Sequence, residues 1–331
     1  MKDFAYLRPR DAQEAVASLA RHRPGARFFA GGTTLFDLMK LGIETPATVI
    51  DITRIDDLQR IDASARREIR IGALATMSEV AEHAVVQREF PALSESLWKA
   101  ASQQLRNMAT VGGNLLQRTR CAYFRDGLEF PCNKRTPGAG CAAIDGLNRT
   151  HAVLGGSSAC VATYPGDMAV ALVAFDALVD TLSPRGARTV AVRELHRAPG
   201  STPHLETVLA DDELIVRIRI PRDAVGRAST YHKIRDRESY AFALTSAAVA
   251  LRLDGSQVAD ARIALGGVAT RPWRATEAER SLIGGSLTRR TARRAATLAF
   301  EGARPLSHNA FKIALGIETV TDALMLAKER T

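Results

Sequence analysis

The sequence predicts an α+β protein in three parts: two α/β subdomains at about 1–60 and 61–222, and a C-terminal α+β domain at about 223–331. Three observations support this prediction. Runs with helical spacing alternate with short β-rich runs over the first third of the chain. A long irregular stretch then interrupts the pattern. The last third has a turn signal between two β-rich runs, followed by helical patterns.

The first part opens with a helix-start signal at Pro9, Arg10 and Asp11, followed by apolar residues at helical spacing. A strand, a tight glycine turn and a second helix are predicted next, and a β-rich run ends this part. In order, the five elements occupy 12–20, 26–30, 31–32, 33–41 and 48–52.

In the second part an irregular segment rich in Gly, Pro, Arg and Cys extends over about 116–163. A segment of this length inside a compact domain is typically functional or disordered. The regular elements expected around it are strands at 68–71 and 213–220 and helices at 77–84, 93–105 and 167–177. In the third part, Asp254 and Gly255 mark a turn between β-rich runs at 231–253 and 258–268, and 275–331 has the pattern of two or three helices.

The composition is that of an ordinary globular protein, with 46% hydrophobic and 24% charged residues. The formal net charge is +9, but basic residues are spread along the chain and aromatic residues make up only 5%. Nucleic-acid binding is therefore not favoured. The N-terminus lacks the apolar stretch of a secretory signal, and no apolar run approaches the length of a membrane span. We expect neither feature in this chain.

Two glycine pairs occur in sequence contexts that suit a bound anion. FFAGGTTLFDL places Gly31 and Gly32 between a strand and a helix start, and ATVGGNL places a second pair before Asn114. Glycine lets the backbone approach a ligand closely, and free N–H groups near a helix N-terminus favour an anion such as pyrophosphate. Neighbouring hydroxyl groups would add hydrogen bonds. Each pair taken alone is also explained as a plain turn.

The four cysteines, Cys121, Cys132, Cys141 and Cys160, all lie within the irregular segment. Without a secretion signal, a disulfide framework is the weaker interpretation. Structural zinc sites usually contain close Cys-x-x-Cys pairs, and none exists here. Four thiolates also satisfy an iron–sulfur cluster, and the many basic residues nearby would offset its negative charge. By spacing alone, an iron–sulfur cluster, a zinc site and unligated thiols all remain open.

The order AGGTTLFDL, ATVGGNL, PGDMAVAL, RIRIP and YHKIRDRESYA resembles the FAD-binding subunits of the xanthine dehydrogenase and carbon monoxide dehydrogenase family, the molybdenum hydroxylases. The resemblance covers essentially the whole chain. It implies a two-subdomain FAD-binding fold of the vanillyl-alcohol-oxidase (PCMH) type and a C-terminal domain of the CO dehydrogenase flavoprotein type. The CNKR and GLNRTHA stretches are similar to aldehyde oxidoreductases of the periplasmic type, whose flavin subunit carries an extra [4Fe–4S] cluster.

The resemblance also implies site residues. The four cysteines would ligate the [4Fe–4S] cluster, Asp167 would bind the adenosine side of FAD, and Ile215 and Lys233 would flank the isoalloxazine. Without the resemblance these three residues are a helix N-cap, strand core and a surface lysine. The expected contacts of the two glycine loops are Phe29, Ala30, Gly31, Gly32, Thr33, Thr34 and Leu35 in the first, and Thr110, Gly113 and Asn114 in the second.

By the same resemblance, the chain is an electron-transfer subunit of a heterotrimer. A large molybdenum-cofactor subunit would oxidise the substrate, a small subunit with [2Fe–2S] clusters would pass electrons to FAD, and an external acceptor would receive them. No acid, base or nucleophile is expected in this chain. The compartment would be the cytoplasm, or the periplasm by co-export with a partner. Alternatives are a subunit of a 4-hydroxybenzoyl-CoA reductase-like or xanthine dehydrogenase-like complex, a stand-alone flavoenzyme, and a zinc-stapled binding protein.

Overall fold

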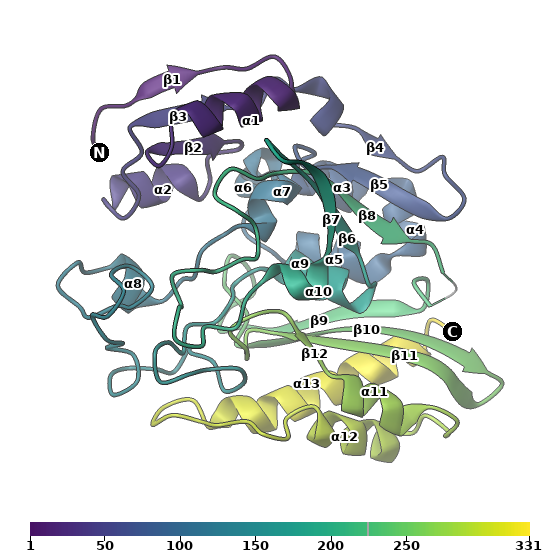
Figure 1. Cartoon of the computed structure of the whole chain (residues 1–331). Helices are drawn as coiled ribbons and strands as arrows, with labels where there is room; N and C mark the ends of the chain where they lie inside the picture. Colours follow the sequence, from purple (N-terminus) through teal and green to yellow (C-terminus); the bar gives the residue numbers. More distant parts are fainter. Residues whose placement is uncertain (224) are drawn as a thin grey trace.

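The computed structural model describes residues 1–331 except 224. Its described strands form three sheets, and Figure 1 shows the N-terminal sheet at the top and the C-terminal helices at the bottom. This mixture of sheets and helices agrees with the predicted α+β class.

The N-terminal sheet is parallel and has the order β1-β3-β2. Helix α1 begins after Asp11, whose carboxylate accepts a hydrogen bond from the backbone N–H of Glu14. Ala15, Val16 and Leu19 of this helix are buried against the sheet. The elements of this unit are β1 (Ala5–Leu7), α1 (Ala12–Arg21), β2 (Ala26–Phe29), α2 (Leu35–Lys40), β3 (Thr48–Asp51) and the 3-10 helix η1 (Asp56–Leu58).

The second sheet is antiparallel and has the order β4-β5-β8-β6-β7. Its strand β8 (Leu214–Pro221) lies between β5 and β6, although it is far from β5 in sequence. The central helix α9 is buried at every residue, which explains why its sequence is apolar on all sides. The other elements are β4 (Ile61–Asp62), β5 (Glu68–Gly72), β6 (Leu178–Ser183), β7 (Gly186–Ala191), α3 (Met77–Glu82), α4 (Ala84–Glu89), α5 (Pro91–Trp98), α6 (Gln103–Met108), α7 (Val111–Leu115), α9 (Asp167–Ala174) and α10 (Val192–Leu195).

The third sheet is antiparallel and has the order β12-β11-β10-β9. Both of its faces are covered: Ala248 and Ala250 belong to the core around α9, whereas Ala247 and Val249 pack with the C-terminal helices. The near-continuous apolar run of β10 follows from this double burial. The elements are β9 (Ser229–Ile234), β10 (Thr245–Asp254), β11 (Gln257–Gly266), β12 (Trp273–Arg274), α11 (Thr276–Leu282), α12 (Arg289–Leu298) and α13 (Phe311–Lys328).

The irregular segment at 116–163, named the cysteine segment from here on, protrudes at the left of Figure 1. Its only described helix is α8 (Ala122–Arg125), and isolated bridges pair Cys132 with Cys141 and Ser157 with Cys160. The prediction of a long segment without regular structure is therefore confirmed.

Several expected elements differ in detail. The helix expected at 93–105 is two helices, α5 and α6, because Ala101 adopts a positive φ of 50° between them. The run at 231–253 is two strands, β9 and β10, joined by a loop. The β6–β7 hairpin has no counterpart among the expected elements, since its second strand is mostly exposed and lacks an apolar pattern.

Candidate functional site

A cavity of about 280 Å³ separates the N-terminal sheet from the second sheet. It brings together nine of the residues predicted to bind FAD, eight from the two glycine loops and one from β8. They are Ala30, Gly31, Gly32, Thr33, Thr34, Leu35, Thr110, Gly113 and Ile215. The two glycine motifs, far apart in sequence, thus line the same cavity.

Glycine is required where the two loops meet. A Cβ atom on Gly31 would lie 1.8 Å from the carbonyl oxygen of Met108, and one on Gly112 would lie 2.8 Å from the Cβ of Ala73. Gly32 has a φ of +72°, which side chains rarely allow. The short helix α2 follows the first loop and has no side-chain cap at its N-terminus. The loops therefore present backbone rather than side chains to the cavity.

A second cavity, of about 430 Å³, continues the first. The two share lining residues, so we treat them as one feature and name it the glycine groove. The shared residues are Arg27, Phe28, Glu44, Leu116, Arg118 and Glu213. The second cavity is also lined by Cys160, His196 and Glu206. The groove therefore extends from the glycine loops to the cysteine segment.

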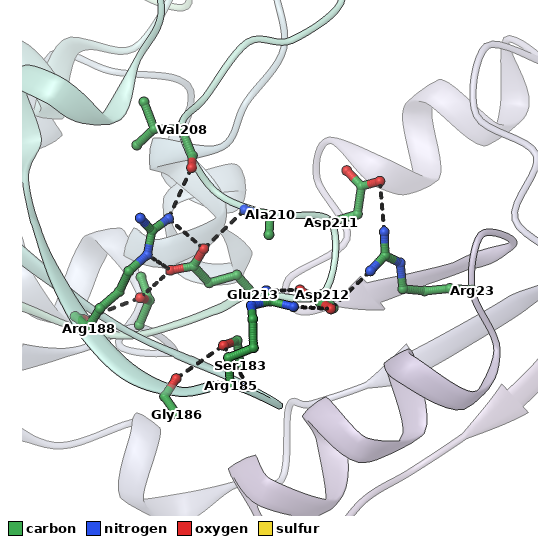
Figure 2. Close-up of polar contacts among 11 residues, drawn as sticks. Arg23, Ser183, Arg185, Gly186, Arg188, Val208, Ala210, Asp211, Asp212 and Glu213 are labelled. Carbon is green, nitrogen blue, oxygen red and sulfur yellow. Dashed lines mark hydrogen bonds and ion pairs between the residues drawn. The ribbon is translucent and has the colours of Figure 1, made fainter.

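Glu213 lines both cavities and is held by an ion-pair network at the start of β8 (Figure 2). Its carboxylate accepts hydrogen bonds from Arg188 at 2.6 and 2.7 Å, from the Thr181 hydroxyl, and from the backbone N–H of Ala210. Burial alone would raise the pKa of Glu213, but the hydrogen bonds from Arg188 and Thr181 outweigh it and lower the pKa. An ionised carboxylate thus lies in the groove wall.

The neighbouring carboxylate of Asp212 points the other way. Figure 2 shows Arg23, from the loop between α1 and β2, and Arg185, from the β6–β7 turn, converging on it. The hydrogen bond from Arg185 is the main reason that the pKa of Asp212 is lowered. The start of β8 is therefore tied to both units that flank the groove.

Four residues predicted to bind FAD do not line the glycine groove: Phe29, Asn114, Asp167 and Lys233. The Asp167 carboxylate, in the first turn of α9, accepts hydrogen bonds from Lys233 at 2.8 Å and from the Tyr231 hydroxyl at 2.6 Å. It borders a separate cavity of about 220 Å³. Asn114 has a buried Oδ1 atom without a partner, and the Phe29 ring lies where a Cβ on Gly32 would be.

The four cysteines converge within the cysteine segment. Cys132 and Cys141 face each other on a two-residue bridge, with the Asn133 N–H donating to the Gly140 carbonyl at 2.7 Å. The interaction with the neighbouring Cys160 thiol lowers the pKa of Cys141 to about 6, and the same interaction raises the pKa of Cys160. Burial raises the pKa of Cys121 to about 11, and its charge interacts with Cys132 and Cys141.

Among the residues that the structure describes, no three His, Cys, Asp or Glu side chains surround one position suited to a single metal ion. A tetrahedral zinc ion requires four ligands at about 2.3 Å from one centre. A Cys₄ iron–sulfur cluster places several iron atoms and sulfides between its thiolates, so its cysteines lie farther apart. Four thiols on one loop segment are the donor set that a Cys₄ cluster requires.

Basic residues in and near the cysteine segment are paired inside the protein. Arg120 and Arg125 both pair with Asp37 of α2, at 3.6 and 2.5 Å. Burial lowers the pKa of Arg120 to about 10. Arg135 donates to four backbone carbonyls of the segment. Positive charge thus lies close to the thiols.

Some residues of the site carried no recognisable signal in the sequence. Glu213, Arg118 and His196 line the groove but resemble ordinary strand, loop and surface residues. Lys312 of α13 is fully buried and donates to the carbonyls of Thr150, His151 and Gly267. It ties the C-terminal helices to the cysteine segment, and nothing in the sequence pattern marks it.

Within the described part of the chain, none of the helices combines the length and apolar character needed to cross a bilayer.

Comparison with known proteins identifies the family of the chain. Residues 2–223 match the family described as the FAD binding domain in molybdopterin dehydrogenase, and residues 229–325 match the CO dehydrogenase flavoprotein C-terminal domain. The chain is 46% identical to the aldehyde oxidoreductase FAD-binding subunit PaoB of Escherichia coli K12, with 99% of each chain covered. It is 28% identical to the carbon monoxide dehydrogenase medium chain of Hydrogenophaga pseudoflava, over 99% and 98% of the two chains.

Two solved structures superpose on nearly the whole chain. A carbon monoxide dehydrogenase structure from Hydrogenophaga pseudoflava superposes with a TM-score of 0.77 at 27% identity and covers 99% of this chain and 98% of its own. Quinoline 2-oxidoreductase from Pseudomonas putida 86 gives a TM-score of 0.76 at 26% identity, covering 100% and 99%. The predicted fold class and the predicted resemblance are thereby confirmed.

Proposed function

Because the chain belongs to the FAD-binding subunits of the molybdenum hydroxylase family of oxidoreductases, we propose that it is the FAD- and [4Fe–4S]-containing electron-transfer subunit of a heterotrimeric, molybdenum-dependent aldehyde oxidoreductase. The observation that carries the proposal is the glycine groove, in which two glycine loops that are distant in sequence line one cavity. The 46% identity to an aldehyde oxidoreductase subunit over the whole chain favours aldehydes as the substrate class.

FAD would bind with its pyrophosphate at the two glycine loops. Backbone N–H groups there are suited to an anion, and the glycines leave room for close approach. Ile215 on β8 lies in the same cavity, which supports its place beside the flavin. Asp167 would contact the cofactor from the separate cavity that it borders, and Lys233 would act beside it through their ion pair. FAD is suited to such a subunit because it exchanges electrons singly or in pairs.

The [4Fe–4S] cluster would be ligated by Cys121, Cys132, Cys141 and Cys160. The paired thiols of Cys141 and Cys160, and the bridge between Cys132 and Cys141, support this ligand set. The arginines around the segment supply positive charge against a thiolate cluster.

The substrate would be oxidised on the large molybdenum-cofactor subunit, and a small [2Fe–2S] subunit would deliver the electrons. This chain's own residues would bind and orient FAD and keep it within reach of an external acceptor. Glu213, Arg188 and Thr181 are mutually satisfied by hydrogen bonds in the structure, which suits a role in the wall of the groove rather than in proton transfer.

The test has three parts. Denaturing the pure protein should release FAD and not FMN, and metal analysis should give about four irons and four acid-labile sulfides per chain. Aldehyde should reduce the flavin only when both partner subunits are present, whereas dithionite should reduce the isolated chain. Reduction of the isolated chain by an aldehyde at the rate of the complex would show instead a stand-alone flavoenzyme.

A further inference from the structure

Arg118 lies where two walls of the glycine groove meet. Its guanidinium donates from Nε to Glu206 and from Nη1 to Glu44, each at 2.7 Å. Glu44 follows α2, and Glu206 lies in the loop between α10 and β8. The Arg118 side chain is only 21% exposed, so salt screens these ion pairs less than pairs on the open surface. Because Arg118 also lines both cavities, it helps to set the shape of the groove.

The same guanidinium also contacts two residues that follow cysteines along the cysteine segment, Phe124 and Lys134. Its Cζ atom lies 4.6 Å from the ring centre of Phe124, three residues after Cys121. Its Nη2 atom lies 3.4 Å from the carbonyl oxygen of Lys134, two residues after Cys132. The position of Arg118 therefore depends on two residues that lie shortly after Cys121 and Cys132 in the chain.

Lys134 strengthens this connection. Its ammonium group donates to the carbonyl of Pro203 at 3.0 Å and lies 3.5 Å from the carboxylate of Glu206. Glu206 is thus shared between Arg118 and Lys134, both from the cysteine segment. A movement of the loop after Cys132 would therefore displace Glu206 as well as Arg118.

We propose that Arg118 is a positioning residue that couples the two cofactor sites, so that ligation of the four cysteines tightens FAD binding in the glycine groove. The inference rests on the proposed function, because it requires both cofactors in one chain. With the thiols ligated, the backbone at Phe124 and Lys134 is held in place, and Arg118 keeps its bonds to Glu44 and Glu206. With the thiols free, the loops that carry these contacts lose their anchorage to the cluster, and the groove wall loses its alignment.

Arg27 provides a matched control. It lines both cavities and pairs with the same carboxylate, Glu44, at 3.4 Å. Its other hydrogen bonds go to the carbonyls of Pro24 and Ala26, at the edge of the N-terminal sheet. Among the described residues, Arg27 therefore shares the groove and the Glu44 carboxylate with Arg118 but contacts neither Phe124 nor Lys134.

The experiment compares FAD affinity of the full chain before and after removal of iron by a chelator, followed by reconstitution with iron and sulfide. FAD binding is titrated by quenching of flavin fluorescence. For the wild-type chain we expect iron removal to weaken FAD binding about tenfold, within the usual range of coupling between two sites. In Arg118→Ala the affinity should be low in both states, with an iron dependence below about twofold, whereas Arg27→Ala should keep the dependence.

Arg118→Lys serves if the alanine variant does not fold. Lysine keeps the charge but lacks the planar fork that reaches both carboxylates, so the iron dependence should again shrink. The coupling would be overturned if an Arg118 variant kept the full iron dependence of FAD binding. It would also be overturned if iron removal did not change the FAD affinity of the wild-type chain. A chain that binds no FAD or no iron would instead contradict the proposed function.

Discussion

Arg23 and Asp212 form an ion pair across the boundary between the N-terminal unit and the second sheet, with Nη1 of Arg23 2.9 Å from Oδ2 of Asp212 (Figure 2). The Asp212 side chain is 6% exposed, and Arg185 of the second sheet binds the same carboxylate. One arginine therefore joins the two units, while the other stays within one of them.

This arrangement predicts different effects for the two arginines. Arg23→Ala should weaken FAD binding, because the walls of the groove lose a direct connection, whereas Arg185→Ala should leave FAD binding nearly unchanged. Both variants should lose a small part of the unfolding free energy, since each removes hydrogen bonds to a charged group that are screened by solvent. Fluorescence titration with FAD and urea denaturation measure the two quantities. Equal FAD affinities in the two variants would contradict the expected link.

Asp212 also predicts a dependence of stability on acid. Because Arg185 and Arg23 lower the pKa of Asp212 in the folded protein, its stabilising contribution is present above the ordinary aspartate pKa of about 3.9 and is lost as the pH falls through the folded-state pKa. Asp212→Asn should remove this part of the acid sensitivity. Urea denaturation between about pH 3 and 6 measures it, and identical slopes for the two proteins would argue against the assignment.

The second glycine loop predicts a variant that empties the flavin site without unfolding the protein. A Cβ on Gly113 would lie 3.1 Å from the Thr110 hydroxyl oxygen, which must shift slightly, and no other contact within 4 Å is found, so a larger side chain would enter the cavity that Gly113 lines. Gly113→Leu should therefore lose most bound FAD, measured as flavin absorbance per chain. Gly285→Leu, at an exposed glycine with room for a Cβ, should keep it. Full flavin content in Gly113→Leu would contradict FAD binding at this loop.

The cysteine segment predicts separable cofactors. Cys132→Ser and Cys141→Ser should lose nearly all iron, because a Cys₄ cluster cannot form with three thiols. Both variants should still take up FAD when the flavin is added in excess, because the glycine loops are distant from these two positions in sequence. Iron, sulfide and zinc analysis of each protein provides the measurement. One zinc and no iron in the wild-type chain would refute the cluster.

Asp167 and Lys233 predict a non-additive pair of substitutions. Their side chains are 5% and 1% exposed and lie 2.8 Å apart. Removing one partner leaves the other buried and unpaired, so Asp167→Asn should cost about 3–5 kcal/mol of unfolding free energy. The double variant Asp167→Asn, Lys233→Met should cost less than the sum of the single changes, as measured by urea denaturation. Simple additivity would show that the two groups do not interact.

Lys312 predicts a dependence of stability on alkaline pH. Burial lowers the pKa of Lys312 from 10.5 to about 7 in the folded protein. Between these two values the unfolded chain binds more protons than the folded chain, so the unfolding free energy should increase with pH over this window. Lys312→Met should lose that slope and should also be less stable, because three backbone carbonyls lose their donor. Urea denaturation at the two ends of the window tests both effects, and an unchanged slope in the variant would contradict this explanation.

The sequence predicted the class of fold well because its evidence is local. The capping residue Asp11, the apolar helix at 167–177 and the alternating strand at 213–220 each form close to where the pattern indicates. The break at Ala101 and the β6–β7 hairpin were not predicted, since a single positive φ and an exposed strand leave little trace in an apolar pattern. The boundaries near 60 and 222 remain predictions.

The residues of the candidate site were likewise predictable from the sequence only in part. The glycine motifs and the four cysteines were evident in the sequence because backbone approach and thiolate ligation demand particular residue types. Arg118, Glu213 and Lys312 were not evident, because an arginine, a glutamate or a lysine acquires its role only from its partners. Asp167, expected as an N-cap if it had no cofactor role, is instead a buried carboxylate paired with Lys233.

By itself, therefore, the sequence determined which elements form, where the backbone must be free of side chains, and which thiols are available as ligands. Only the tertiary structure decided that β8 enters the second sheet between β5 and β6, so that Ile215 and Glu213 reach the groove beside the glycine loops. It also decided that Arg118 joins Glu44, Glu206 and the cysteine segment. The physical reason is that such contacts link residues far apart in the chain, and packing and charge pairing in the folded state select them, whereas local propensity carries no information about them.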